Sequence, residues 1–130
     1  MLTLFVVQSC ADPKDAGETV ASFAGLCEDV WRVPNIQAIN EVAVTTNWYG
    51  VIYDNEHIDE PLLEGLKVFV RESEADVLVL LKETKHKRYF RCPRMFRRDV
   101  MLKESVLLPA RGGLVFDTVL NGMIHDNDFI

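Results

Sequence analysis

Two carboxylates and an imidazole follow directly after a short apolar run in this chain. The run, residues 48–53, is rich in β-branched and aromatic residues and is bounded by turn-forming residues, so we expect a buried strand. Asp54 and Glu56 stand two positions apart. In an extended segment their side chains project to the same side and can share one hard cation. The segment from Asp54 to His57 is therefore the first candidate for a metal site.

A purely structural role explains the same residues. Asp and Asn form turns, and an acidic residue stabilises the N-terminus of a helix that follows it. In this interpretation His57 has a structural role alone, in the turn that leads to Asp59, and Asp59 is a good helix cap. On the residues alone, both interpretations stay open.

The composition indicates one globular domain over residues 1–130. The chain is 48% hydrophobic, which is enough for a single core at this length. No stretch is long and apolar enough for a membrane span, and residues 1–7 lack the features of a signal peptide. We therefore expect a cytoplasmic protein.

Charge is distributed unevenly along the sequence. The net charge is −6, yet nine of the fourteen basic residues lie between Lys82 and Lys103, where Glu83 and Asp99 are the only acidic ones. This indicates either an anion-facing segment on an acidic body or a solvated hairpin that balances an acidic neighbour or subunit. We do not expect a general nucleic-acid binder.

The hydrophobic pattern predicts an α/β fold. Strands are expected at residues 2–8, 30–33, 48–53, 77–81 and 89–96. Helices are expected after Asp12, Asn35 and Asp59, with a short one near residues 115–123. Helices between successive strands give a mostly parallel sheet with helices on both faces, a Rossmann-like sandwich, and the last strand is expected to run antiparallel.

Three stretches resemble the family 2 glycosyltransferases, which have the GT-A fold. They are Ala38-Ile39-Asn40-Glu41, the segment from Trp48 to Glu56, and Pro93-Arg94-Met95-Phe96-Arg97-Arg98. In that family an Ala-x-Asn helix precedes a strand ending in Asp-x-Asp, and a Pro-Arg-Leu-Phe-Arg-Arg stretch is common. The resemblance covers about residues 38–98. It departs from the family at Val33-Pro34-Asn35, where an Asp-rich turn is usual, and in the short length of the chain.

The resemblance implies roles for particular residues. Asp54 and Glu56 would bind Mn²⁺ or Mg²⁺ and, through it, the diphosphate of a nucleotide-sugar donor, with His125 as a distal metal ligand. Arg94, Arg97 and Arg98 would pair with phosphate oxygens in bidentate geometry. Asp117 resembles the acidic residue that deprotonates the acceptor hydroxyl. The sequence does not show which molecule is the acceptor. Such a cation would stabilise the diphosphate leaving group.

Three functional hypotheses follow. The first is a small, metal-dependent glycosyltransferase-like protein that binds a nucleotide-diphosphate sugar. The second is a catalytically inactive domain of the same fold that acts as an oligomeric or partner-binding module through its basic edge. The third, from the basic segment alone, is a protein that binds nucleic-acid phosphates through residues 82–98.

Overall fold

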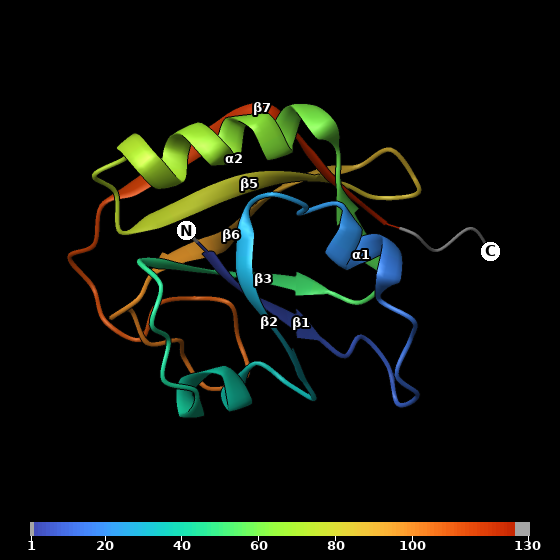
Figure 1. The fold of residues 1–130 in the computed structure, drawn as a ribbon, viewed down its shortest axis with the longest axis horizontal. Coiled ribbons are helices and arrows are strands. Elements are labelled where there is room, and N and C mark those ends of the chain that lie inside the picture. Colours follow the sequence, from blue (N-terminus) through green and yellow to red (C-terminus); the bar gives the residue numbers. More distant parts are fainter. Residues whose placement is uncertain (1, 127–130) are drawn as a thin grey trace.

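One seven-stranded sheet runs through the part of the chain described by the computed structural model, residues 2–126 (Figure 1). In chain order the elements are β1 (Leu2–Val7), α1 (Gly17–Ala21), β2 (Cys27–Val33), the 3-10 helix η1 (Gln37–Glu41), β3 (Trp48–Tyr53), β4 (Glu56–Ile58), α2 (Glu60–Glu72), β5 (Val77–Glu83), β6 (Tyr89–Arg97) and β7 (Phe116–Asp126).

The sheet is mixed, with strand order β2-β1-β3-β6-β5-β7-β4. β1 pairs in parallel with β2 and β3, and β5 pairs in parallel with β7. β6 runs antiparallel to β3 and β5, and β4 runs antiparallel to β7. β1, β2, β3, β5 and β7 therefore all point the same way. We call the end of the sheet where these five strands finish, at Val7, Val33, Tyr53, Glu83 and Asp126, its carboxyl end.

The predicted sandwich with helices on both faces is wrong. The described residues form a mostly β structure in which α2 is the one long helix, and it lies across a single face of the sheet (Figure 1). The opposite face is covered by η1 and by the loops at residues 98–115, which contribute buried side chains such as Ile39 and Leu102. Loops have replaced the helices expected there.

Two of the predicted connecting helices are much shorter than predicted, for identifiable reasons. After β1, residues 9–16 form a loop, in which the side chain of Asp54 binds the backbone N–H groups of Ser9 and Lys14, and the helix α1 begins only at Gly17. The helix predicted after Asn35 shrinks to the five residues of η1. There the side chain of Asn40 bonds the backbone of Leu102 through both its amide nitrogen and its oxygen.

The helix predicted near residues 115–123 is instead strand β7. β7 pairs in parallel with β5, and Val79 and Thr118 are register partners. Tertiary pairing has thus overridden an ambiguous local pattern.

The core divides into two layers according to strand alternation. Leu2, Leu4 and Val6 face α2 and pack with its Leu62 and Leu66. The alternate residues of β1 point to the other face, where they join the second cluster: Phe5, Val7, Val33, Ile36, Ile39, Tyr49, Val51, Val77, Phe96, Val100 and Leu102. The predicted α2 is confirmed: it begins at an N-cap, Asp59, whose carboxylate accepts a hydrogen bond from the N–H of Leu62 at 3.0 Å.

Candidate functional site

Asp54 and Glu56 lie at the carboxyl end of β3, as the sequence predicts. A tight turn at Asp54 and Asn55 joins β3 to the short β4, which begins at Glu56. Asp54 is 2% exposed and Glu56 is not exposed at all. Two carboxylates so fully buried require compensating donors.

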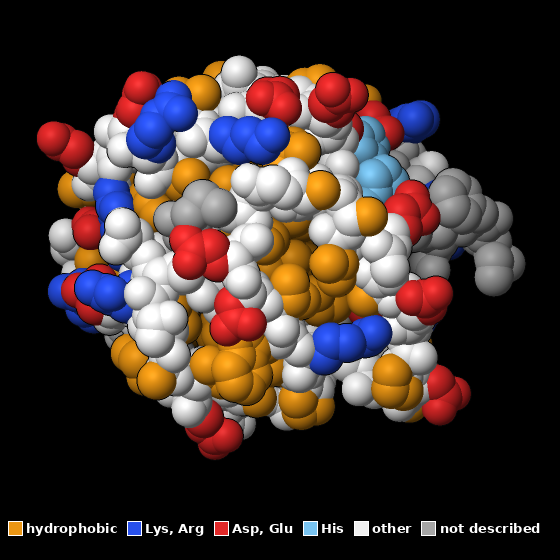
Figure 2. All heavy atoms as spheres, in the orientation of Figure 1, with side chains coloured by type: hydrophobic (Ala, Val, Ile, Leu, Met, Phe, Trp, Pro, Cys, Tyr) orange, Lys and Arg blue, Asp and Glu red, His pale blue; other side chains and the backbone are white. Residues whose placement is uncertain are grey.

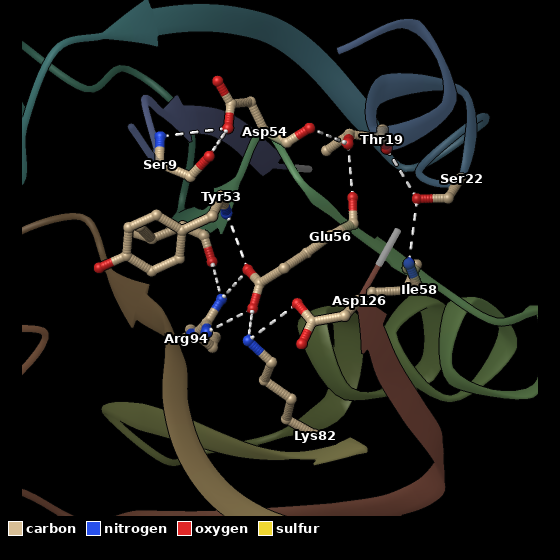
Figure 3. A network of polar contacts seen from close by, with 11 residues as sticks. Ser9, Thr19, Ser22, Tyr53, Asp54, Glu56, Ile58, Lys82, Arg94 and Asp126 are labelled. Atoms are coloured by element: carbon tan, nitrogen blue, oxygen red, sulfur yellow. Dashed lines mark hydrogen bonds and ion pairs between the residues drawn. The ribbon is translucent and has the colours of Figure 1, made fainter. Parts of the chain in front are cut away.

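The carboxylate of Asp54 ties three segments together. One oxygen accepts hydrogen bonds from the N–H and the hydroxyl of Ser9, the former at 3.1 Å (Figure 3). The other oxygen accepts from the N–H of Lys14 at 3.1 Å and from Nη2 of Arg32 at 3.3 Å. Asp54 therefore fixes the loop after β1 and the end of β2 to the end of β3.

Glu56 is the centre of a buried ion cluster (Figure 3). Its two oxygens lie 2.7 and 3.0 Å from Nη1 and Nη2 of Arg94, which is a bidentate pair. Nζ of Lys82 lies 2.6 Å from one of these oxygens and 3.4 Å from Asp126. The N–H of Tyr53 also donates to Glu56, at 2.8 Å.

The ion cluster shifts the protonation equilibria of its members. Burial by itself would raise the pKa of Glu56, but the hydrogen bonds and positive charge of Arg94 and Lys82 outweigh it, so the pKa is lowered. Burial likewise works to lower the pKa of Lys82, and the contact with Glu56 raises it. Glu56 therefore stays ionised at neutral pH.

The two carboxylates do not fit a shared divalent cation in this arrangement. Each oxygen of Asp54 and Glu56 already accepts from protein donors, and a cation at Glu56 would have to displace Arg94 and Lys82. Among residues 2–126 there is no group of three or more His, Cys, Asp or Glu side chains able to hold a metal ion. Binding of Mn²⁺ or Mg²⁺ stays a prediction from the resemblance.

The three arginines of the predicted phosphate site do not converge. Arg94 reaches Glu56, which lies just after the carboxyl end of β3. Arg97 is the register partner of Trp48, the first residue of β3, and so lies at the amino end of that strand. There its guanidinium stacks on the Trp48 ring, 4.0 Å from the centroid, and donates to the backbone of Ser73 and Ala75. Arg98 donates to the carbonyl of Thr45 at the same end.

Asp117 and His125 are also separated from a common site. Asp117 pairs with Leu78 near the start of β5, so it lies at the amino end of the sheet, away from Asp54. His125 lies at the carboxyl end, where its Nε2 is 2.9 Å from Asp59 and its ring stacks on His57 with centroids 5.3 Å apart. His125 thus supports the start of α2.

A hollow of about 260 Å³ opens at the carboxyl ends of β1, β2 and β3. We call it the carboxyl-end pocket. Its lining combines apolar residues with amide, hydroxyl and phenol groups: Val7, Gln8, Pro34, Asn35, Ile36, Gln37, Tyr53 and Ser105. The guanidinium of Arg94 lies 5.3 Å from the centre of the Tyr53 ring and so supports one wall.

The predicted site omitted residues that the fold places at the carboxyl end. Lys82 follows the apolar run 77–81 just as Asp54 follows 48–53, so its position at a strand end was visible in the sequence. Gln8 is the last residue of one predicted strand, and Asn35 lies two residues after another. Their proximity depends on the strand order, which periodicity does not give.

No protein-family model matches this chain, and no curated protein matches it. The glycosyltransferase resemblance therefore rests on the three sequence stretches that carry it. None of the helices in residues 2–126 has the length and apolar character needed to cross a membrane.

Proposed function

We propose that this protein binds the nucleoside part of a nucleotide-diphosphate sugar in the carboxyl-end pocket. The observation that carries the proposal is the pocket itself, formed where three adjacent parallel strands end. Ligands of open sheets with parallel strands commonly bind outside the carboxyl ends of those strands. The resemblance to family 2 glycosyltransferases supplies the class of ligand.

The chemistry of the lining suits a heterocyclic base. Gln37 carries an exposed side-chain amide, which holds donors and an acceptor in one plane and can match the edge of a base. Nε2 of Gln8 already donates to the carbonyls of Cys10 and Ala11, so Gln8 offers its amide oxygen. Oδ1 of Asn35 already accepts from the N–H of Ala38, so Asn35 offers its amide nitrogen. Tyr53 adds an aromatic wall, and Pro34 an apolar one. The volume of about 260 Å³ is slightly below the ~300–1,000 Å³ typical of small-molecule sites. It suits one ring system with its ribose, and the phosphates then extend outward.

Arg32, at the end of β2, is our candidate for binding those phosphates. Its side chain is 44% exposed and is held by Asp54 at 3.3 Å. A guanidinium oriented in this way can still donate to a phosphate oxygen. The proposal is limited to binding, because Asp117, the predicted base, lies at the opposite end of the sheet.

A thermal-shift titration with UDP, GDP, CDP and dTDP, each with and without Mn²⁺, tests the proposal. A ligand held only by the folded state stabilises it by about 2.7 kcal/mol at a hundredfold excess over the dissociation constant. We expect one nucleotide to raise the melting temperature without Mn²⁺. A shift that appears only with Mn²⁺ would support the metal prediction instead.

Two matched variants locate the binding. Gln37→Trp fills the carboxyl-end pocket from an exposed position and should abolish the shift. Asn47→Trp, also exposed, enters the hollow beside Arg97, Arg98 and Asp99 and should leave the shift unchanged. No shift with any nucleotide, or equal loss in both variants, would contradict the proposal.

A further inference from the structure

The first half of β7 forms an outer edge of the sheet. Within residues 2–126, β5 is the only strand paired with residues 116–119, because β4 pairs with β7 at residues 124–126 alone. In Figure 1, β7 accordingly lies along the upper rim of the molecule, above β5. Figure 2 shows hydrophobic side chains at this rim, among acidic and basic ones. Such an edge offers its backbone groups to a further strand.

The register shows which backbone groups of β7 point away from β5. The N–H of Val77 donates to the carbonyl of Val115, so Val115 directs its backbone toward β5. The pairing has no bulge over residues 116–119, so this direction alternates regularly, and Phe116 and Thr118 direct theirs outward. The N–H of Thr118 accordingly donates to a side chain, at 2.9 Å.

A hollow of about 190 Å³ lies beside this edge, between α2 and β7. We call it the α2–β7 hollow, and its lining consists of Val68, Phe69, Glu72, Ser73 and Asp117. Val68 is 42% exposed, so its apolar surface is accessible here. The volume is well below the ~300–1,000 Å³ typical of small-molecule sites. It therefore suits a single side chain.

We propose that β7 binds an extended segment of a partner protein, which adds to the sheet as an antiparallel strand and places a Lys or Arg side chain in the α2–β7 hollow. Strand addition at a free sheet edge is a general mode of peptide recognition. The backbone groups of Phe116 and Thr118 pair with the added strand. Its residue between those two pairs lies opposite Asp117 and projects to the same face, toward α2.

The charges at the hollow select a basic side chain. Oδ1 of Asp117 accepts from the N–H of Thr118, and Oδ2 has no partner among the residues that the structure describes. Opposite charges directly across an antiparallel pair are favourable. Glu72 lies 3.6 Å from Nη2 of Arg71, but both side chains are exposed, and an exposed ion pair is weak. The aliphatic part of a Lys or Arg side chain can pack on the apolar wall while its charged end meets the carboxylates.

A second copy of this chain does not supply such a side chain through its own β7. The strand Phe116–Asp126 contains neither Lys nor Arg, so no register of β7 with β7 sets either residue opposite Asp117. The register that pairs Phe116 with Thr118 sets Asp117 opposite Asp117, which is unfavourable. These charges favour a different protein as the partner.

Fluorescence anisotropy with a labelled peptide tests the strand and its basic residue. The probe is the peptide Thr-Val-Thr-Val-Arg-Val-Thr, which is rich in strand-forming residues and carries one Arg. We expect saturable binding, and the same peptide with Glu in place of Arg should bind about tenfold more weakly. Equal binding of the two peptides, or no binding of either, would overturn the proposal.

A pair of charge variants locates the basic side chain. Asp117→Lys should weaken binding of the Arg peptide about tenfold and strengthen binding of the Glu peptide. Glu41→Lys makes the same change of charge at an exposed position of η1, on the opposite face of the sheet, and should alter neither affinity. Equal effects of the two variants would overturn the assignment to the α2–β7 hollow.

A backbone variant tests the pairing itself. Thr118→Pro removes an outward N–H, which an edge strand tolerates, and should abolish binding of the Arg peptide. Thermal unfolding checks that this variant is folded. Sedimentation equilibrium of the unmodified chain completes the test. A dimer that Thr118→Pro dissociates, without peptide binding, would assign the edge to a second copy and overturn the proposal.

Discussion

Glu56 shows how a residue pattern typical of a metal site can instead hold the protein's own cations. In the sequence, Asp54 and Glu56 have the spacing of two carboxylates that share a divalent ion. In the fold, Arg94 and Lys82 supply the positive charge at Glu56, at 2.7 and 2.6 Å. The acidic and basic members lie on different strands, so the sequence predicted the carboxylates but not their partners.

Replacing Glu56 by Gln should destabilise the protein strongly. The change keeps the side-chain shape but leaves Arg94, which is 5% exposed, without its counter-charge. Breaking one side of a buried ion pair costs roughly 3–5 kcal/mol. Urea unfolding measures the loss. Glu64→Gln on the exposed face of α2 is the control and should change the free energy of unfolding by less than about 0.5 kcal/mol. A loss at Glu56 as small as that of the control would show that the cluster is not stabilising.

The unmodified protein and Glu56→Gln should differ in how their stability responds to acid. The pKa of Glu56 is lowered in the folded state, so its contribution to stability is present above the unfolded value of about 4.3 and is lost as pH falls through the folded value. The stability difference between the unmodified protein and Glu56→Gln should therefore be constant from about pH 7 to about pH 5, and shrink at lower pH. A difference that grows on acidification would contradict this assignment, and urea unfolding at each pH measures it.

At the scale of elements, the junction between β7 and α2 depends on Gly122. A Cβ at this position would lie 2.2 Å from Oδ1 of Asp59 and 2.5 Å from the backbone nitrogen of Leu62, and φ is +156°. Asp59 caps α2 and also accepts from the N–H of Met123. The close approach therefore joins the strand to the start of the helix.

Gly122→Ala should lower the free energy of unfolding by about 2 kcal/mol or more, because it displaces the cap of α2 and strains β7. Gly112→Ala is a matched control, since an added Cβ there meets no heavy atom within 4 Å. It should be neutral to within about 0.5 kcal/mol. Equal effects of the two substitutions in urea unfolding would refute the role given to this junction.

The elements that could be predicted are those whose local pattern and tertiary surroundings agree. The strands β1, β3 and β5 and the helix α2 were predicted correctly. In each strand the apolar run of the sequence is mostly buried, and α2 buries its apolar stripe and begins at a capping residue. The helices before β2 and before β3 were not formed as predicted. Contacts with distant segments shorten them to α1 and η1: Asp54 binds the backbone of the loop before α1, and Asn40 within η1 binds the backbone of Leu102.

At the scale of the whole molecule, the fold divides the basic segment into two parts. Lys82 and Arg94 are counter-ions of Glu56, and Arg97 stacks on Trp48. The residues from 85 to 91 are exposed around the turn between β5 and β6. Charge counting along the sequence could not separate these roles, because they depend on which strands are neighbours.

The same limit applies to the candidate ligand site. The end of β3 could be predicted from the apolar run and the turn residues after it. The carboxyl-end pocket could not, since Gln8, Asn35, Tyr53 and Ser105 come from four separate segments. They meet because β1 lies between β2 and β3, and because the loop containing Ser105 folds over that end.

The central claim is that a nucleotide binds at the carboxyl ends of β1, β2 and β3, and the most direct measurement is a ¹H–¹⁵N NMR titration with UDP, GDP, CDP and dTDP. For one of them, we predict saturable shifts in the amide signals of Gln8, Asn35, Gln37 and Tyr53, with those of Asn47 and Asp99 unchanged. Saturable shifts centred on Asn47 and Asp99, or no shift with any nucleotide, would contradict it.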